Sequence, residues 1–283
     1  MSYTITRLFS DPAFPFVMSE IHDDDYSFPL HNHETLELAI ILSGQGIHLI
    51  DGVEYGVSAG DIFVIPTDST HAFQHLSGMH LVNILFDPAL LAADEDALRQ
   101  LPGYHALFVL EPSYRQRHTF RSHLRLPYAD LPVISDLLAR MLKEFKAAQP
   151  GYRVLVRSLL VQFIVYCARA YSLASRSQSR LLIQLGEVIS YLDHAYTQPI
   201  GLREIAEVAS MSERTLIRRF KEGMGISPIE YIIRRRLQRG AELLREGNRS
   251  VSEVAFAVGF TDSNYFSRQF KRMMGVSPRA FSG

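Results

Sequence analysis

The pattern of apolar and polar residues changes character about halfway along the chain. In the first part, short apolar or alternating runs at residues 36–42, 46–50, 61–66 and 79–86 are separated by turn sequences such as SGQG and SAGD. Runs of this kind predict β-strands. The dipeptide DG, between LI and VEY, predicts a tight hairpin. Several short strands with regular turns predict a sandwich or a barrel.

From Leu131 onward the apolar period lengthens to about 3.6 residues, which predicts helices. DLPVISDLLARMLKEFKAA and YRVLVRSLLVQFIVYCARAYSL each carry a broad apolar stripe. We interpret these two helices as a dimer or interdomain surface, with a cover for the open end of a barrel as the equal alternative. The polar run ASRSQSR, residues 174–180, lacks such a period and predicts a linker, after which the chain reads as helical.

The last part of the chain contains an internal repeat. A shift of 50 residues places RTLIRRFKEGMGISPIEY, from Arg214, on NYFSRQFKRMMGVSPRAF, from Asn264. Upstream the separation is 49, between EIA at Glu204 and EVA at Glu253. The second unit therefore has one extra residue in the turn before its second helix. A repeat of this length indicates a duplicated supersecondary unit.

Each repeat reads as a short helix, a tight turn and a second helix. Residues suited to N-caps precede the helices: Ser212, Thr261 or Asp262, and the two Ser–Glu pairs Ser250–Glu253 and Ser227–Glu230. In each second helix an apolar side opposes a polar one: Leu216 and Phe220 against Arg214, Arg218 and Lys221, then Phe266, Phe270 and Met273 against Asn264, Ser267, Arg268 and Lys271. Because Arg pairs with guanine and Asn with adenine, this pattern is typical of a recognition helix. The alternative, a bundle with a solvated basic face, explains one such helix more easily than two.

Charge separates the two parts of the chain. Residues 1–179 carry 13 Lys and Arg against 19 Asp and Glu, whereas residues 180–283 carry 16 against 11. We therefore expect only the second part to meet a polyanion. The length of 283 residues allows two compact domains. The single cysteine, Cys167, fits a reducing compartment, and neither a signal peptide nor a bilayer span is predicted, so we expect a cytoplasmic protein.

The second repeat, with GFTDSNYFSRQFKRMMGVSP, resembles the C-terminal signature of AraC/XylS-type transcriptional regulators over about residues 182–281. The resemblance implies two helix-turn-helix units, at about 200–223 and 250–273, whose recognition helices enter adjacent major grooves of double-stranded DNA. The joining helix would start at Pro228, and about 18 residues would span about 27 Å, close to one turn of DNA. Carried over by position, the DNA-binding residues are Arg214, Thr215, Ile217, Arg218, Lys221, Ser263, Asn264, Ser267, Arg268 and Lys271. Arg234, Arg235 and Arg236 are expected to contact phosphates or to pair within the domain.

The stretch HNHETLE places His31, His33 and Glu37 at odd positions, which face one way on an extended chain. Its spacing, extended to Gly44, resembles the first motif of the cupin barrel, and GDIFVIPTDSTH, which ends at His71, resembles the second. The resemblance implies that these three histidines and one carboxylate form a set able to hold a divalent metal. Two residues depart from the enzyme pattern, namely Asp68 at a usual glycine and His75 at a usual asparagine.

These features predict an α+β chain. Residues 1–175 would form a cupin-like β-barrel followed by helices, for effector binding and dimerisation, and residues 176–283 an all-α DNA-binding domain. We expect a transcription regulator, an activator by the tendency of the family, that acts as a homodimer, contacts RNA polymerase and does not bind membranes. HNHETLELAIILSGQGIHLIDG resembles sugar-responsive members such as the rhamnose and arabinose regulators, which implies a sugar or sugar derivative as effector.

The candidate effector-binding residues are His31, His33, Glu37 and His71, and a metal, if one binds, would use the same four. We assign no catalytic residue and no certain cofactor, and we expect no enzyme. The alternatives are a metal-dependent cupin enzyme, a metal-sensing regulator, or purely structural hydrogen bonds. Phe9, Phe14 and Phe16 suggest an N-terminal arm that could close over the pocket.

Overall fold

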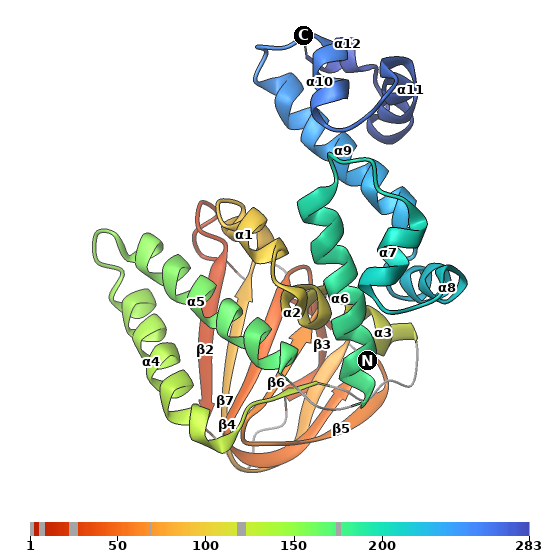
Figure 1. Cartoon of the computed structure of the whole chain (residues 1–283). Helices are drawn as coiled ribbons and strands as arrows, with labels where there is room; N and C mark the ends of the chain where they lie inside the picture. The colour runs from red at the N-terminus through yellow and green to blue at the C-terminus, as the bar shows by residue number, and fades with distance from the viewer. Residues whose placement is uncertain are drawn as a thin grey trace. The chain divides into compact units, whose positions relative to one another are not determined.

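The computed structural model describes residues 3–5, 9–22, 28–67, 69–117, 123–173 and 177–282. The chain forms two compact units, Met1–Ile183 and Gln184–Gly283, and each is described by itself. The first is a β-sheet with helices and the second is all helical (Figure 1). The predicted α+β class is thereby confirmed. Asp68, one of the departures from the cupin pattern, lies outside the described residues.

One sheet of eight described strands forms the centre of the first unit. The hydrogen-bonded order is β1-β3-β7-β4-β6-β8, with β2 also paired to β7 and β5 to β4. Neighbours are antiparallel apart from the β1–β3 pair. The strands are β1 (Tyr3–Ile5), β2 (Phe16–His22), β3 (Phe28–His33), β4 (Leu36–Ile50), β5 (Val53–Ser58), β6 (Asp61–Ile65), β7 (His71–Phe86) and β8 (Leu124–Arg125). The predicted strand-rich domain is therefore present.

The two longest strands, β4 and β7, pair along their whole length but change register between Ile41 and Ile47. The irregularity requires glycine. Gly44 has a φ of 80°, and a Cβ there would lie 2.3 Å from the carbonyl oxygen of Gly78. Because of this shift, the inward-facing positions change from odd numbers, such as Ile41, to even numbers, such as Ile50.

The predicted DG hairpin is confirmed. Asp51 and Gly52 have φ values of 49° and 80°, and Ile50 pairs directly with Val53. Positive φ at both turn residues is the geometry that matches the right-handed twist of two joined strands. The turn therefore fixes the register of β4 against β5.

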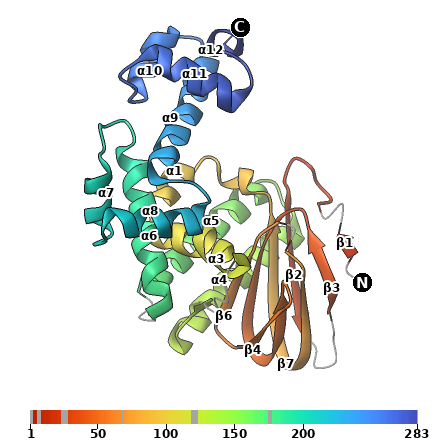
Figure 2. The same ribbon diagram turned by 90° about the vertical axis from the view of Figure 1, so that its right-hand side faces the viewer.

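The helices of the first unit lie on one side of the sheet (Figure 2). They are the 3₁₀ helices η1 (Pro88–Leu91) and η3 (Tyr128–Asp130), the short helices α1 (Glu95–Arg99), α2 (Pro102–Tyr104), η2 (His105–Leu110) and α3 (Glu111–Arg117), and the long helices α4 (Leu131–Ala147) and α5 (Tyr152–Ser172). Phe16 packs edge-on against Phe145 of α4, and Phe14 against Tyr152 of α5. The expectation that these two phenylalanines close over a pocket is therefore wrong, because both are buried against the helices.

Helix α5 has 21 residues and is long and apolar enough, by length and composition, to cross a membrane. It packs along α4 and meets α2 so closely that a Cβ on Gly103 would lie 1.9 Å from the carbonyl oxygen of Ala168. Core helices of soluble proteins share this composition, so one such helix is weak evidence for a membrane span.

Helix α6 (Ser177–Ala195) begins inside the predicted linker. Residues 177–180 are helical, which corrects the prediction of a linker over 174–180, and residues 174–176 lie outside the described residues. Leu182 and Leu185 are fully buried. Burial of this apolar side stabilises the helical conformation of the residues before and after it. The two compact units divide within α6, between Ile183 and Gln184.

The second unit contains the predicted repeat. Its helices after α6 are α7 (Leu202–Val208), α8 (Glu213–Met224), α9 (Pro228–Arg245), α10 (Val251–Ala257), α11 (Ser263–Met274) and α12 (Pro278–Phe281). Ala206 of α7 and Ala255 of α10 are both buried, and their carbonyls accept equivalent hydrogen bonds of 3.0 Å from Met211 N and Phe260 N. The two turns therefore share one backbone design, with the extra residue in the second as predicted.

The predicted caps are present with one exception. Ser212 accepts from Thr215 N, Asp262 from Asn264 N, and Ser250 with Glu253 forms a full capping box. Ser227 also caps α9 by accepting from Glu230 N, but the Glu230 carboxylate pairs with Arg234 at 2.7 Å. On α11, Phe266 and Phe270 are fully buried, whereas Met273 is 38% exposed. Met274 packs against that core instead, which corrects the placement of Met273 on the buried side.

Candidate effector site and DNA-binding surface

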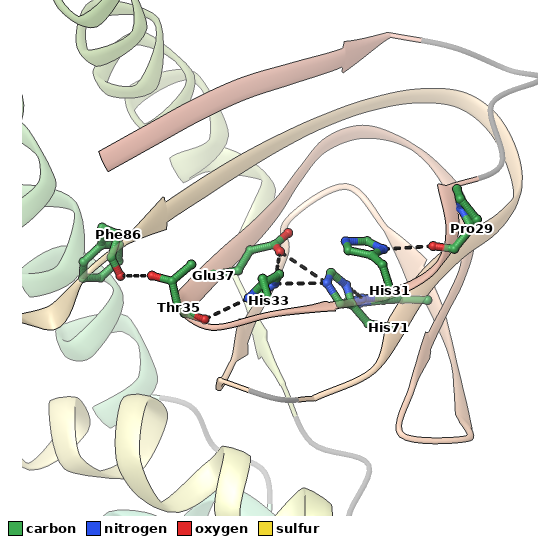
Figure 3. Close-up of polar contacts among 8 residues, drawn as sticks. Pro29, His31, His33, Thr35, Glu37, His71 and Phe86 are labelled. Carbon is green, nitrogen blue, oxygen red and sulfur yellow. Dashed lines mark hydrogen bonds and ion pairs between the residues drawn. The ribbon is translucent and has the colours of Figure 1, made fainter. Parts of the chain in front are cut away.

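The four histidine and glutamate residues singled out in the sequence lie together inside the first unit (Figure 3). His31 and His33 lie on β3, Glu37 begins the inward face of β4, and His71 begins β7. Strand pairing places His31 directly opposite His71. None of the four is more than 4% exposed. The strand ends, joined by the bend at residues 34–35, therefore bring together groups that the sequence separates.

Short polar contacts connect this cluster. His33 Nε2 lies 2.6 Å from Glu37 Oε2, and His71 Nε2 lies 3.3 Å from the same oxygen. The Nε2 atoms of His33 and His71 are 3.2 Å apart. The imidazoles of His33 and His71 thus meet at one carboxylate oxygen of Glu37.

Backbone carbonyls fix the orientation of two rings. His33 Nδ1 donates to the Thr35 carbonyl at 2.9 Å, and His31 Nδ1 donates to the Pro29 carbonyl at 2.9 Å. A carbonyl oxygen can only accept, so both Nδ1 atoms carry the hydrogen. The Thr35 hydroxyl is itself held by the Phe86 carbonyl at 2.6 Å. The Nε2 atom of His31 is therefore the ring nitrogen that can face a ligand, whereas Nε2 of His33 is already bonded to Glu37.

The cluster holds a buried charge pair. Burial would raise the pKa of Glu37, but the charge of His71 and the hydrogen bond from His33 hold that pKa well below its ordinary value. Burial would lower the pKa of His33, but the hydrogen bond and charge of Glu37 raise it. For His31, burial and then the charge of His71 lower the pKa. The site therefore combines an ionised Glu37 carboxylate with the imidazole of His33, whose protonated form that carboxylate stabilises, and with His31, whose protonated form burial disfavours.

A fourth histidine, His48, belongs to the same site and was not predicted. It is fully buried, stacks on Phe73 with ring centroids 3.9 Å apart, and places Nε2 3.3 Å from His71 Nδ1. Burial, and then the charge of His71, lower the pKa of His48 well below its ordinary value. Its even number concealed it, because the register shift in β4 turns even positions inward only after Ile41.

Further charged groups lie within electrostatic reach of His48, among them Arg115 of α3 and His123. Arg115 is buried, lies 5.8 Å from the Phe63 ring centroid, and pairs with Glu111 at 3.1 Å. Burial raises the pKa of Glu111 to about 7. The sequence did not indicate that Arg115 and Glu111 lie near this site. Three strands and several short helices separate α3 from β4 along the chain.

Several buried polar atoms of this interior make no hydrogen bond among the described residues. They include Glu37 Oε1, His48 Nδ1, Asn83 Oδ1 and Arg115 Nη1. Asn83 pairs with Ala39, which shares the inward face of β4 with Glu37. Buried polar groups normally have a partner, so the interior is chemically suited to a polar ligand.

A divalent metal ion also fits the cluster. Ligand atoms of His31, Glu37 and His71 lie within 4.8 Å of one another, and among the described residues His33 is not part of this group. Hydrogen bonds from Nδ1 to carbonyls, as at His31, are what metal-ligating histidines usually make. A bound ion would act as a Lewis acid that orients hydroxyl or carboxylate groups of a ligand.

In the second unit the predicted recognition helices α8 and α11 lie at the two ends of α9 (Figure 1). Both bury their apolar side, since Leu216, Phe220, Phe266 and Phe270 are all fully buried. The predicted contact residues divide by exposure. Arg214, Ile217, Arg218, Lys221, Asn264, Arg268 and Lys271 are exposed, whereas Thr215, Ser263 and Ser267 are half-buried.

Some of these side chains have partners within the protein. Arg218 Nη1 donates to Glu222 at 2.9 Å, and the Ser267 hydroxyl donates to the Ser263 carbonyl at 2.9 Å. The Arg268 guanidinium lies 5.8 Å from the Tyr265 ring centroid. Arg218 would have to leave Glu222 in order to make a bidentate contact with a base.

The three consecutive arginines of α9 have different roles. Arg236 donates to the carbonyls of Tyr196 and Gln198, and Arg235 lies 3.5 Å from Asp193. Arg234 pairs with Glu230 on the surface. The expectation of pairing within the domain is therefore confirmed for all three arginines.

Comparisons with known proteins find a matching domain in each of the two units. Residues 14–164 match the AraC-like ligand-binding domain, and residues 205–283 match a helix-turn-helix domain. The HTH-type transcriptional activator RhaS of Escherichia fergusonii is 32% identical, over 97% of this chain and 96% of the relative. The HTH-type transcriptional activator RhaR of Pectobacterium carotovorum is 31% identical, over 90% of this chain and 86% of the relative.

Among solved structures, the DNA-binding domain of the global transcriptional factor AdpA, in complex with a target DNA, is 34% identical. That match covers 35% of this chain and 89% of the other, with a TM-score of 0.33. The two domain matches together with the near full-length relatives decide the assignment: the chain belongs to the AraC-type family of DNA-binding transcription regulators, with a ligand-binding domain ahead of its helix-turn-helix domain.

Proposed function

We propose that this regulator activates transcription in response to a sugar or sugar derivative bound inside the folded sheet of the first unit. The observation that carries the proposal is the set of buried, unpartnered polar atoms, Glu37 Oε1, His48 Nδ1 and Asn83 Oδ1. Each such atom costs about 1–3 kcal/mol when it lacks a partner. Sugar hydroxyls both donate and accept hydrogen bonds, so one polyol can satisfy several of these atoms at once.

The effector-binding residues in this proposal are His31, His33, Glu37 and His71, with His48 added. His31 is neutral and offers Nε2, whereas the His33–Glu37 pair offers charge-assisted hydrogen bonds, which are stronger than neutral ones. The relatives RhaS and RhaR are both named HTH-type transcriptional activators, which supports the proposal of an activator.

For DNA, we propose that α8 and α11 enter adjacent major grooves. Arg214 and Arg218 on α8, and Asn264 and Arg268 on α11, would read base edges, with Ile217 near a thymine methyl. Lys221 and Lys271 would contact phosphates. The half-buried residues Thr215, Ser263 and Ser267 would contribute to DNA binding through their hydroxyl groups or their backbone. An activator of this kind would act as a homodimer in the cytoplasm and contact RNA polymerase.

In this proposal the protein is not an enzyme. The carboxylate that a metal-dependent cupin enzyme would give to its metal is bonded to His33 at 2.6 Å, which favours a binding role for the cluster. The effector must bind one arrangement of the chain more tightly than another, since equal affinity for both shifts no equilibrium.

The effector proposal is tested by thermal unfolding of EDTA-treated protein with a panel of monosaccharides and sugar acids. We expect one sugar to raise the melting temperature of the wild type and to lose this effect in Asn83→Leu. Glu34→Gln, a change at an exposed neighbour of the cluster, is the matched control. Stabilisation by divalent metal alone, with no sugar effective, would contradict the proposal and favour a metal-sensing regulator.

The DNA proposal is tested by selecting a binding site from random DNA and measuring affinity by fluorescence anisotropy. Arg268→Ala should lose about tenfold to a hundredfold in affinity and stop discriminating at one base pair. Lys271→Ala should weaken all sequences equally and reduce the slope against salt by about one. Arg203→Ala, on an exposed pair of α7, should leave affinity unchanged. Equal sequence preference in Arg268→Ala and the wild type would argue against base reading by this residue.

A further inference from the structure

A second group of metal-ligating side chains lies on the outer face of the sheet, away from the buried cluster. Along β2, alternate residues face one way, and Phe16 and Met18 on this face are buried. The next two residues of that face, Glu20 and His22, are exposed. On the neighbouring strand β7, His80 pairs directly with His22. Two imidazoles and a carboxylate therefore gather where the apolar cover of the sheet ends.

The geometry points to a surface site for a first-row divalent transition metal, with Zn²⁺ as the physiological candidate, formed by Glu20, His22 and His80. Ligand atoms of these three residues lie within 4.8 Å of one another. Two histidines with one carboxylate are a ligand set that binds Zn²⁺ and its neighbours.

The distances favour an ion over a hydrogen bond. Glu20 Oε1 and His80 Nε2 are 3.4 Å apart, and His80 Nε2 makes no hydrogen bond among the described residues. A tetrahedral zinc ion with bonds of about 2.0 Å keeps two ligand atoms about 3.3 Å apart. The observed separation is thus long for a charge-assisted hydrogen bond but matches two ligands of one ion.

The two imidazoles are held in place by the sheet. The rings of His22 and His80 stack with centroids 4.0 Å apart and planes inclined by 30°. Directly paired residues on antiparallel strands have Cβ atoms about 5 Å apart, so the backbone already brings both rings to one ion. Little side-chain order has to be gained on binding, and the ion would tie the end of β2 to the middle of β7.

This site differs from the buried cluster in its access. The side chains of His80 and Glu20 are 24% and 28% exposed, whereas His33 and Glu37 are at most 1% exposed. An ion attached to a solid support can therefore approach through the exposed side chains of Glu20 and His22, although the Nε2 atom of His80 is itself buried, whereas it cannot reach the interior cluster. This difference separates the two sites experimentally.

The test uses the full-length chain without a histidine tag on an immobilised Ni²⁺-chelate resin, followed by titration with ZnCl₂ by calorimetry. We expect the wild type to be retained, and His22→Ala and His80→Ala each to elute at a lower imidazole concentration. In calorimetry His80→Ala should lose one Zn²⁺ site or bind at that site at least tenfold more weakly. Glu20→Gln should show a smaller loss of the same kind, because one of three ligands is weakened.

His194→Ala removes an exposed histidine of the second unit and should elute with the wild type. Circular dichroism without metal should be the same for all variants of the surface site. The inference is overturned when His22→Ala and His80→Ala both elute with the wild type and the number of Zn²⁺ sites stays the same.

Discussion

The two units present their polar binding groups in opposite ways. In the first unit, the side chains of His31, His33, Glu37, His48 and His71 are buried, and hydrogen bonds link His33, Glu37, His48 and His71 to one another. In the second, the arginines and lysines of α8 and α11 project from the surface while phenylalanines occupy the core beneath them. A small effector needs an enclosed set of donors and acceptors, whereas DNA needs an exposed row of cations.

This difference has an energetic consequence. A buried charge without its partner destabilises the fold strongly, while an exposed one is solvated in any case. Binding residues of the first unit are therefore also residues of the fold, and most changes there should affect stability and binding together. Binding residues of the second unit should be separable from the fold.

The largest expected effect is at Glu37. In Glu37→Gln the protonated form of His33, which Glu37 stabilises, loses its buried counter-ion, so we expect the free energy of unfolding of the first unit to fall by about 3 kcal/mol at pH 7. A carboxyl with a lowered pKa stabilises the fold above 4.5, its unfolded pKa, and loses that contribution as the pH falls towards its folded pKa. The difference between variant and wild type should therefore shrink below pH 4.5. Urea unfolding from pH 3 to 8, with Glu34→Gln as control, measures this, and a difference independent of pH would contradict the charge pair.

A smaller and opposite effect is expected at His48 in metal-free protein. Because the pKa of His48 is lowered in the folded state, this side chain is protonated below pH 6.5 in the unfolded chain but not in the folded chain. The folded state therefore becomes less stable as the pH falls below 6.5. His48→Phe removes this loss. Relative to the wild type it should gain up to about 1.4 kcal/mol for each pH unit below 6.5. Denaturant unfolding at pH 7.5 and 5.5 measures the gain, and no change in relative stability would show that His48 is protonated in the fold.

In the second unit, the N-cap of the recognition helix α11 tests how the helix is anchored. Asp262 accepts from Asn264 N at 2.8 Å, so Asp262→Ala should cost about 1 kcal/mol. Thr261→Ala, one residue earlier and also exposed, should cost little and serves as the control. Thermal unfolding reports the difference. Equal losses in the two variants would show that Asp262 contributes no more to the stability of α11 than Thr261 does.

The smallest effect on stability is expected at the exposed arginines. Arg214→Gln should change the free energy of unfolding by about 0.5 kcal/mol or less, because the side chain is exposed on α8. The same variant should bind the selected DNA site more weakly in fluorescence anisotropy. A large loss of stability in Arg214→Gln would contradict the expectation that the binding residues of the second unit are separable from its fold.

The features that could be predicted from the sequence depend on interactions between residues close together in the chain. The Asp51–Gly52 turn, the caps at Ser212, Ser250 and Asp262, and the buried sides of α8 and α11 all depend on residues within about five positions of one another. Turn and cap preferences and helical periods act over that range. The repeat strengthened these predictions because the same pattern occurred twice.

The buried site needed the tertiary structure. His31, His33, Glu37 and His71 were identified by a motif. That His33 and His71 meet at one oxygen of Glu37, with His31 opposite His71, depends on the pairing of β3 with β7 and of β7 with β4.

The sequence by itself determined the two-part organisation, the repeated helix-turn-helix units, their caps and the identity of the main cluster. Only the tertiary structure decided that His48 and Asn83 join the interior and that His22 meets His80 on the outside. The reason is strand register. A single shift near Gly44 reverses which residues of β4 face inward, and nothing in the local residue preferences of a strand encodes its partner in another.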